Sequence, residues 1–327
     1  MVSTLLSSFL VNKVDPDIDI IKQATESQKK LKEILTNKLA EDPTLPSVLE
    51  GHDFLFGSAM RGTKPKPFDD IDLMLVLDGA TLVAKENGMD VGTAFGSENF
   101  YNPLTADKYL DENGLISSQK ILNCIRSLVD ETYHRSEIRK DGQAVNVWME
   151  SYGFGIDIVP AFKIKHNTAG VHYYIPYGAG SHMWKSTNPH HDLNWFEQED
   201  VRLSGLLRPT ARLLRKWNEL SNDSRLTGFH VDTLVFRSLN GKEIKNLEQA
   251  ARECFSSFEA LLSETCPQFS GFLPHIDHYL TVENRQKSQE KIRSANVSLL
   301  SLGLSRLMGK DNSLEVWNKI FDCKLYE

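Results

Sequence analysis

The chain lacks paired cysteines, long apolar runs and internal repeats. Its four cysteines, Cys124, Cys254, Cys266 and Cys323, lie far apart in 327 residues and form no CxxC pair. Isolated cysteines argue against a disulfide framework or a structural zinc site, and they favour a reducing, cytoplasmic setting. Since no apolar stretch approaches the length of a membrane span, we expect no membrane partner.

An excess of positive charge is also missing. Lysine and arginine number 37 against 44 acidic residues, which gives a formal net charge of −7. Long nucleic acids are bound through dense positive charge, so this balance argues against such a partner. Nucleotides are not excluded, because they need only a local pocket. The 40% hydrophobic and 25% charged composition is typical of a globular protein with a large core.

The apolar spacing changes character along the chain. It predicts helices over 17–40 and 117–133, strands over 71–77, 144–149 and 154–162, and an almost wholly helical region over 199–327. We expect residues 163–196 to form a long irregular stretch. The fold class is therefore α/β, with a mixed sheet in residues 1–198 and a helical C-terminal lobe, residues 199–327, that closes a cleft against it.

The stretch FGSAMRGTKPKPFDDIDLML, residues 56–75, joins a loose half to an apolar, strand-like half that carries acids. Alternate strand residues point the same way, so Asp70 and Asp72 share a face. Two adjacent carboxylates repel each other unless a cation lies between them, and Mg²⁺ prefers carboxylate and phosphate oxygens. Gly57-Ser58 offers backbone N–H groups and a hydroxyl that can hold phosphate. The combination suggests a nucleoside triphosphate.

A third acid lies in another apolar strand. Asp157 in GIDIVPAF is flanked by Ile156 and Ile158. Because acids are rare in buried strands without a partner, a second such strand strengthens the prediction of a site that holds two metal ions.

These motifs together resemble a known superfamily. GSAMRGT, DDID and GIDIVPAF look like the glycine-serine motif, the DxD strand and the later carboxylate of DNA polymerase β-type nucleotidyltransferases. YYIPYGAGSHMWKSTNP and RLLRKWN narrow the resemblance to the bacterial CD-NTases, which are cGAS/DncV-like nucleotidyltransferases with a SMODS domain. The resemblance spans roughly residues 27–235. It implies that residues 1–198 form the catalytic core, with an N-terminal helix.

The resemblance implies a role for each carboxylate and for the loop before them. Asp70 and Asp72 would hold two Mg²⁺ ions, with Mn²⁺ able to substitute. Asp157 would help to hold the ion that activates the attacking hydroxyl. Gly57 and Ser58 would grip the triphosphate of the donor nucleotide.

The second lobe would contribute further nucleotide contacts. Lys216 would reach the same phosphates, although its spacing alone also fits a surface lysine on an amphipathic helix. Phe229 matches a position that can stack on a base, and core packing is the alternative. Gly228 stands where the family often has a serine that contacts phosphate, so this sequence departs from the pattern there.

The expected activity is nucleotidyl transfer between nucleoside triphosphates, ATP among them. It would yield a cyclic di- or trinucleotide that signals in antiphage (CBASS-type) defence and is read by a separate effector protein. One alternative is a nucleotidyltransferase that acts on an RNA end, a small molecule or a protein. An alternative of another class is a non-catalytic nucleotide-binding module. The bases used, the ring size, the linkage, the need for an activator and the oligomeric state stay open.

Overall fold

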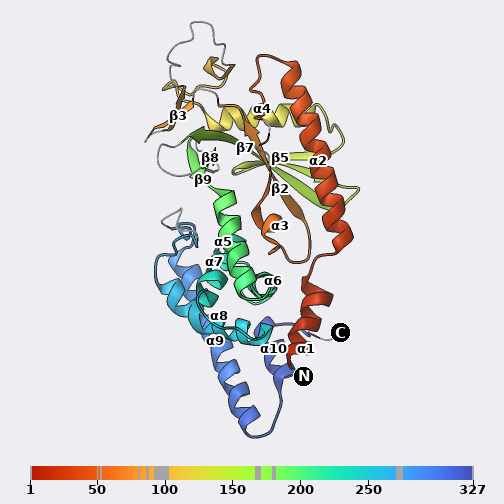
Figure 1. Ribbon diagram of the computed structural model, residues 1–327, viewed down its shortest axis with the longest axis vertical. Helices are drawn as coiled ribbons and strands as arrows, with labels where there is room; N and C mark the ends of the chain where they lie inside the picture. The colour runs from red at the N-terminus through yellow and green to blue at the C-terminus, as the bar shows by residue number, and fades with distance from the viewer. Residues whose placement is uncertain are drawn as a thin grey trace. The chain divides into compact units, whose positions relative to one another are not determined.

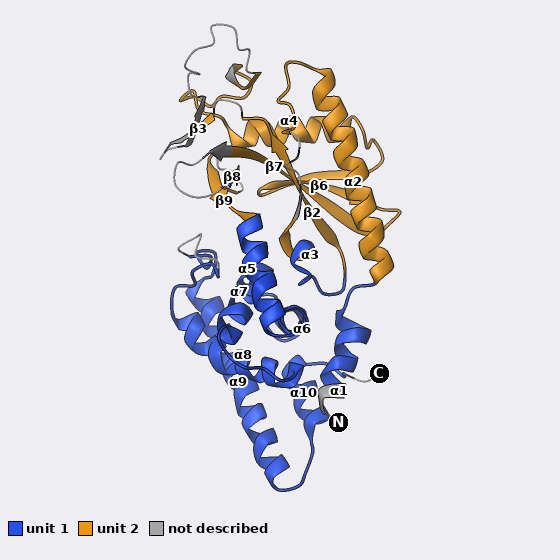
Figure 2. Cartoon of the chain, in the orientation of Figure 1, with its two compact units in different colours: residues 1–17, 60–67, 190–327 blue, residues 18–59, 68–189 orange. Residues whose placement is uncertain are grey.

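The computed structural model describes residues 2–49, 51, 54–79, 82–85, 88–91, 103–165, 171–178, 182–269 and 275–325. The chain divides into two compact units, shown in different colours in Figure 2. The sheet unit comprises residues 18–59 and 68–189, and the helical unit comprises residues 1–17, 60–67 and 190–327. The chain thus passes from one unit to the other several times.

The sheet unit is built on one seven-stranded mixed sheet with the order β1-β2-β7-β6-β5, to which β8 and β9 are added beside β7 (Figure 1). Its strands are β1 (Phe54–Phe56), β2 (Asp70–Leu77), β5 (Glu137–Asp141), β6 (Ala144–Met149), β7 (Phe154–Lys165), β8 (Val171–Pro176) and β9 (Trp184–Thr187). Only β2 and β7 pair in parallel, and the other pairs are antiparallel. β3 (Leu82–Lys85) and β4 (Gly88–Val91) form a separate hairpin, and η2 (Pro103–Thr105) is a short 3-10 turn.

The two faces of this sheet are covered differently. Helices α2 (Ile18–Glu41) and α4 (Ser118–Asp130) pack on one face, where Leu31, Leu35 and Ile121 are fully buried against Ile71 and Leu73 of β2. We call this the helix-covered face. The opposite face has a smaller apolar cluster, which consists of Met74, Val76, Ala144, Val159, Ala161, Tyr173 and Ile175.

The helical unit is held by one large apolar core around Trp217, Phe255 and Trp317, all with side chains that are almost completely buried. It contains α1 (Val2–Phe9), the π-helix η1 (Leu10–Val14), α5 (Pro189–Arg202), α6 (Leu207–Leu220), α7 (Gly228–Leu239), α8 (Leu247–Ser263), α9 (Val282–Leu307) and α10 (Ser313–Phe321). Apolar side chains from these helices meet in that core. The five-residue α3 (Gly57–Arg61) begins in the sheet unit and ends in the helical unit.

Most of the elements expected from apolar spacing are present, and the predicted fold class is confirmed. The exception is the stretch 163–196, where the prediction of a long irregular segment was wrong. Its described residues include the end of β7, strands β8 and β9, and the start of α5. β8 and β9 are short. β8 pairs with the C-terminal end of β7 and β9 pairs with β8, and the local sequence does not reveal these partners.

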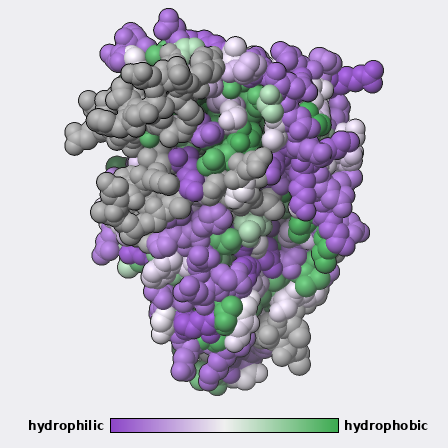
Figure 3. Space-filling model, turned by 45° about the horizontal axis from the view of Figure 1, so that its top comes forward, coloured by the Kyte–Doolittle hydropathy of each residue, from purple (hydrophilic) through white to green (hydrophobic). Residues whose placement is uncertain are grey.

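The described helices include none that is long and apolar enough to cross a membrane. Among the described residues, the face shown in Figure 3 is largely hydrophilic, and its hydrophobic side chains lie in smaller separate patches.

Candidate active site

Strands β2 and β7 bring two of the predicted acids side by side. In their parallel pairing Asp72 is opposite Asp157, and Asp70 is opposite Gly155. Paired residues on neighbouring strands share a face, so Asp70, Asp72 and Asp157 all lie on the face opposite the helices. We call this the acid-bearing face. The apolar cluster that includes Met74 and Val159 continues it further along the same two strands.

The alternation of burial explains how β2 tolerates its acids. Asp70 and Asp72 are half-buried, whereas Ile71 and Leu73 between and after them are buried on the helix-covered face. The strand is therefore apolar on one side throughout, and polar on the other side only at its N-terminal end. The amide of Gln28 on α2 donates a hydrogen bond of 2.9 Å to the backbone carbonyl of Asp72, which fixes the strand against that helix.

Asp157 is held by a polar neighbour on the next strand. Asn146 of β6 is its register partner, and the Asn146 side-chain amide donates a 2.6 Å hydrogen bond to one carboxylate oxygen of Asp157. Asn146 also lies close to Gly155, where a Cβ atom would come within 2.7 Å of its amide nitrogen. The amide therefore orients Asp157 without adding charge. Sequence analysis missed Asn146, although its place between buried valines in AVNVWM is a visible signal.

Gly57 lies directly against the Asp72 carboxylate. Its φ is +77°, and an added Cβ atom would be 1.9 Å from Asp72 Oδ2, so a side chain cannot be accommodated there without displacing the acid. Gly57 and the half-buried Ser58 start α3, whose first N–H groups have no partner within the helix. The loose glycine-serine turn is thereby placed beside the acids, within the same compact unit.

The residues present have the right chemistry for hard divalent cations. Asp70, Asp72 and Asp157 supply carboxylate oxygens on one sheet face, and Gly57 leaves space beside one of them. Within the described ranges, however, no three His, Cys, Asp or Glu side chains converge closely enough to hold a metal ion jointly. Like-charge repulsion and the Asn146 hydrogen bond both favour separated carboxylates. The pairing of Asp72 with Asp157 is found, and joint coordination by all three acids stays a prediction.

Lys216 is on α6 in the helical unit, and it is engaged within that unit. Its side chain is only 12% exposed, and its ammonium group lies 2.7 Å from Glu219 Oε1, one turn further along the helix. It also donates a 3.1 Å hydrogen bond to the carbonyl of Lys66. Lys216 is therefore oriented by these two partners rather than freely solvated. A contact with phosphate stays a prediction.

Phe229 is in the first turn of α7 and is packed more tightly than a free stacking platform would be. The guanidinium of Arg61 lies over its ring, 4.9 Å from the centroid, and the ring of Phe269 is 5.7 Å away. Phe229 also packs against the core of the helical unit. Both observations fit the alternative of core packing, and stacking on a base stays a prediction.

The departure at Gly228 has a physical reason in this chain. A Cβ atom at Gly228 would lie 2.6 Å from Arg215 Nη1 and 2.7 Å from Arg215 Cζ. The guanidinium of Arg215 therefore occupies the space that a serine side chain would need at the start of α7.

A buried ionic cluster around Asp232 was missed by sequence analysis. Asp232 is fully buried in α7, and its carboxylate accepts hydrogen bonds from Arg61 (3.1 Å), Thr63 (2.8 Å) and Arg215 (2.7 Å to each oxygen). Burial alone would raise the pKa of Asp232, but the charges of Arg215 and Arg61 outweigh it and hold the pKa below its usual value. The acid in the apolar helix GFHVDTLVF was the available signal.

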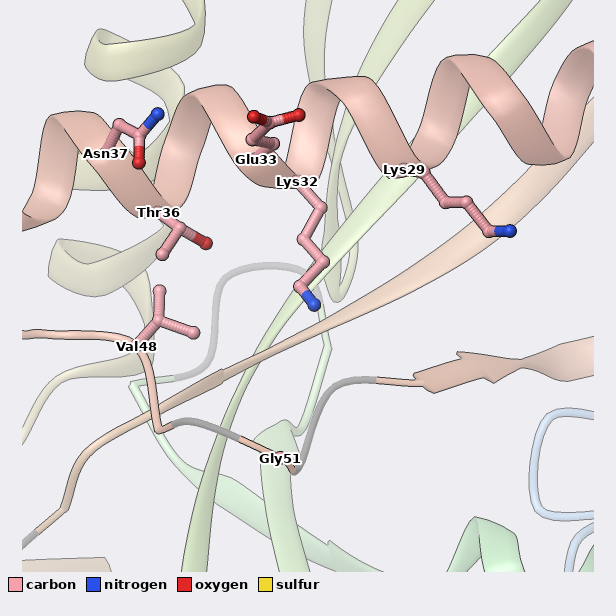
Figure 4. Close-up of a pocket in the computed structure, with 7 residues that line it drawn as sticks. All are labelled: Lys29, Lys32, Glu33, Thr36, Asn37, Val48 and Gly51. Carbon is pink, nitrogen blue, oxygen red and sulfur yellow. The ribbon is translucent and has the colours of Figure 1, made fainter.

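A separate pocket of about 340 Å³ lies on α2, on the opposite side of the sheet from the acids. It is lined by Lys29, Lys32, Glu33, Thr36, Asn37, Val48 and Gly51. Figure 4 shows the side chains of Lys32 and Thr36 directed to the side of the helix on which Val48 and Gly51 lie. None of the predicted site residues lines this pocket, so the pocket and the acid-bearing face are distinct features.

Sequence comparison identifies relatives with a common activity class. Residues 102–200 match the SMODS family, the Second Messenger Oligonucleotide or Dinucleotide Synthetase domain. A probable cyclic nucleotide synthase of Bacillus cereus (strain VD146) is 27% identical over 328 residues, which span 96% of this chain and 94% of that protein.

Solved structures share the fold along nearly the whole chain. CdnC of E. coli MS115-1, solved with ATP, matches with a TM-score of 0.72 at 14% identity, over 99% of this chain and 98% of that one. CdnC in its complex with HORMA-deltaN matches with a TM-score of 0.70 at 16% identity, again over 99% of this chain and 98% of that one. The CdnE cyclic dinucleotide synthase of Elizabethkingia meningoseptica, solved with GTP and Apcpp, matches with a TM-score of 0.61 at 14% identity. This match covers 88% of this chain and 95% of that one. The chain thus shares the fold of the bacterial CdnC and CdnE structures, matches the SMODS domain over residues 102–200, and is similar along nearly its whole length to a probable cyclic nucleotide synthase.

Proposed function

We propose that this protein is a metal-dependent synthase that joins nucleoside triphosphates, ATP among them, into a cyclic di- or trinucleotide. The observation that carries the proposal is the register of β2 and β7, which places Asp72 beside Asp157 with Asp70 on the same face. The relatives named above support cyclisation, since one is named a probable cyclic nucleotide synthase and another a cyclic dinucleotide synthase.

The chemistry is an in-line displacement at phosphorus. A ribose hydroxyl oxygen of the acceptor nucleotide bonds to the α-phosphorus of the donor, and the bond to the β-phosphate breaks, releasing pyrophosphate. Asp70, Asp72 and Asp157 would hold two Mg²⁺ ions, which would supply charge neutralisation and a more acidic hydroxyl. The chain itself contributes mainly positioning. Asn146 orients Asp157, and Gly57, which has no side chain, leaves room for the Asp72 carboxylate beside the turn.

The biological setting belongs to the same proposal. The product would act as a second messenger in antiphage defence of the CBASS type in the cytoplasm, and a separate effector protein would bind it. The SMODS match supports the messenger role, because the domain is named for second-messenger synthesis.

The test is product analysis. Purified protein is incubated with all four NTPs and Mg²⁺ or Mn²⁺, without template. We expect a small product that phosphatase leaves intact, because a closed ring has no terminal phosphate, and a mass that corresponds to two or three nucleotides. Phosphatase-sensitive ends would indicate a linear transferase instead. Label that appears only on added RNA or protein would refute cyclisation.

A further inference from the structure

Lys185 on β9 lies on the acid-bearing face of the sheet. It is the register partner of Ile175 on β8, which belongs to the apolar cluster of that face. Its neighbour Trp184 is buried in the core under the helix-covered face, as the alternation of a strand requires. Lys185 therefore shares its face with Asp72 and Asp157.

The position of β9 in the sheet places Lys185 on one side of the acids. Phe162 of β7 pairs with Leu77 of β2 and also with Tyr174 of β8, so β8 and β9 extend from the edge of β7 that faces away from β2. The Gly57-Ser58 turn follows β1, which flanks β2 on the other side. The glycine-serine turn and Lys185 thus lie on opposite sides of the paired acids within the sheet unit.

Among the residues that the structure describes, the ammonium group of Lys185 has no counter-charge. Although the side chain is half-buried, no described residue forms a hydrogen bond or an ion pair with it, and burial lowers its pKa. Two other partly buried lysines, Lys216 and Lys120, have partners. Lys216 has Glu219 and a backbone carbonyl, and Lys120 donates to the carbonyls of Asp107 and Leu110.

An unpaired, partly desolvated ammonium group costs free energy in the folded protein. Such a cost is tolerated where a ligand supplies the missing charge. Lys185 lies two strands across the sheet from Asp157 and is displaced from it by four residues along β7. At standard strand spacings this corresponds to roughly 16 Å between their backbones. A lysine side chain shortens that gap further. A nucleoside triphosphate extends over a comparable length.

We propose that Lys185 binds a phosphate oxygen of a nucleotide that lies on the acid-bearing face, on the side of β7 away from the Gly57-Ser58 turn. This inference rests on the proposed function, in which the donor triphosphate lies at that turn. The in-line attack on its α-phosphorus then places the acceptor nucleotide on the other side of the acids. Lys185 is then a binding residue for the nucleotide that supplies the attacking hydroxyl. Its unpaired charge in the free protein is the cost of that contact.

The experiment compares Lys185→Met, which removes the charge at similar length, with Lys185→Arg, which keeps it. Lys140→Met is the matched control, because Lys140 is an exposed lysine on β5 of the same sheet. Three quantities are measured on the full chain. They are the melting temperature without ligand, the affinity for a triphosphate with a non-scissile α,β bridge, and KM with kcat.

Lys185→Met should melt no lower than the wild type, because an unpaired buried charge has been removed. Its affinity for the analogue should fall about ten- to a hundredfold, as expected for a lost hydrogen bond to a charged group. KM should rise by a similar factor with a much smaller change in kcat. Lys185→Arg should recover most of the affinity, and Lys140→Met should behave as the wild type.

Two results would overturn the inference. Unchanged affinity in Lys185→Met, whatever its stability, would remove the phosphate contact. A lower melting temperature together with lower affinity would show that Lys185 is a structural residue. If the wild type binds the analogue and loses it in Lys185→Met but makes no cyclic product, the inference on Lys185 stands and the proposed function fails.

Discussion

The buried cluster around Asp232 allows a quantitative prediction for Asp232→Asn. The substitution keeps the volume but replaces one carboxylate oxygen with an NH2 group, which can only donate. The Asp232 carboxylate accepts all four hydrogen bonds of the cluster. They are donated by Arg61, by Thr63 and by two nitrogens of the Arg215 guanidinium. In the variant, the two buried guanidinium groups therefore lack a compensating negative charge. Both arginine side chains are 10% exposed and Asp232 is 0% exposed, so solvent screens the cluster little.

Removing one partner from a buried ionic network costs about 3–5 kcal/mol. At roughly 2–4 °C per kcal/mol for a unit of this size, the melting temperature of the helical unit should fall by about 6–20 °C. The folded-state pKa of Asp232 is lowered, so its stabilising effect is complete above the unfolded value and is lost as the pH falls through the folded pKa. At pH 7 the Asp232→Asn substitution should therefore cause the full loss of stability.

The assay is urea unfolding at pH 7, followed by circular dichroism. Asp223→Asn is the matched control, because Asp223 pairs with Arg225 at the surface with its side chain 70% exposed, and such pairs contribute less than about 1 kcal/mol. A free energy of unfolding within 1 kcal/mol of the wild type for Asp232→Asn, about the control's range, would refute the reasoning. It would mean that water or rearranged side chains replace the lost charge.

Three further predictions concern the site and the pH dependence of stability. Asp72→Asn should keep the fold and lose several orders of magnitude in turnover, and EDTA should abolish wild-type activity; more than about a tenth of wild-type turnover in the variant would contradict the role of Asp72. Ser58→Ala and Lys216→Ala should each weaken nucleotide binding about ten- to a hundredfold. The melting temperature of Lys216→Ala should barely change, because its partner Glu219 is 41% exposed. A sharp drop in the melting temperature with unchanged nucleotide affinity would make Lys216 a structural residue. Burial lowers the pKa of His230 to about 4, so the unfolded chain binds more protons between that value and 6.5, and stability should fall by about 2 kcal/mol from pH 7.5 to pH 5. Urea unfolding of His230→Gln should show that part of the pH slope removed, and an unchanged slope would assign it to other groups.

The sequence was informative where local pattern and fold agree. The helical spacing of Leu31, Leu35 and Leu39 corresponds to α2, and the apolar run after Asp70 corresponds to β2. Both elements bury one stripe or one face in the same core, so periodicity alone was sufficient. Strands β8 and β9 could not be predicted in this way, because each is defined by a partner strand rather than by its own residues.

The candidate site divides in the same manner. Acids within apolar strands are unusual enough to be noticed, and their strand register brings Asp72 and Asp157 together. The partners that orient the site were not visible. Asn146 contacts Asp157 only because β6 and β7 form a hairpin in one particular register, and Asp232 lies 171 residues from Arg61. Long-range contacts of this kind depend on the tertiary structure.

The odd composition of residues 56–75 follows from several constraints that meet in one short segment. Gly57 must lack a side chain because the Asp72 carboxylate occupies its Cβ position. Gly62 has a φ of +69°, and a Cβ atom there would be 3.1 Å from the side chain of Arg208. Between and after these glycines, Arg61 and Thr63 are anchored to Asp232 in the helical unit. The two glycines of this segment are therefore each required by the close approach of a charged side chain within its own unit, Asp72 beside Gly57 and Arg208 beside Gly62.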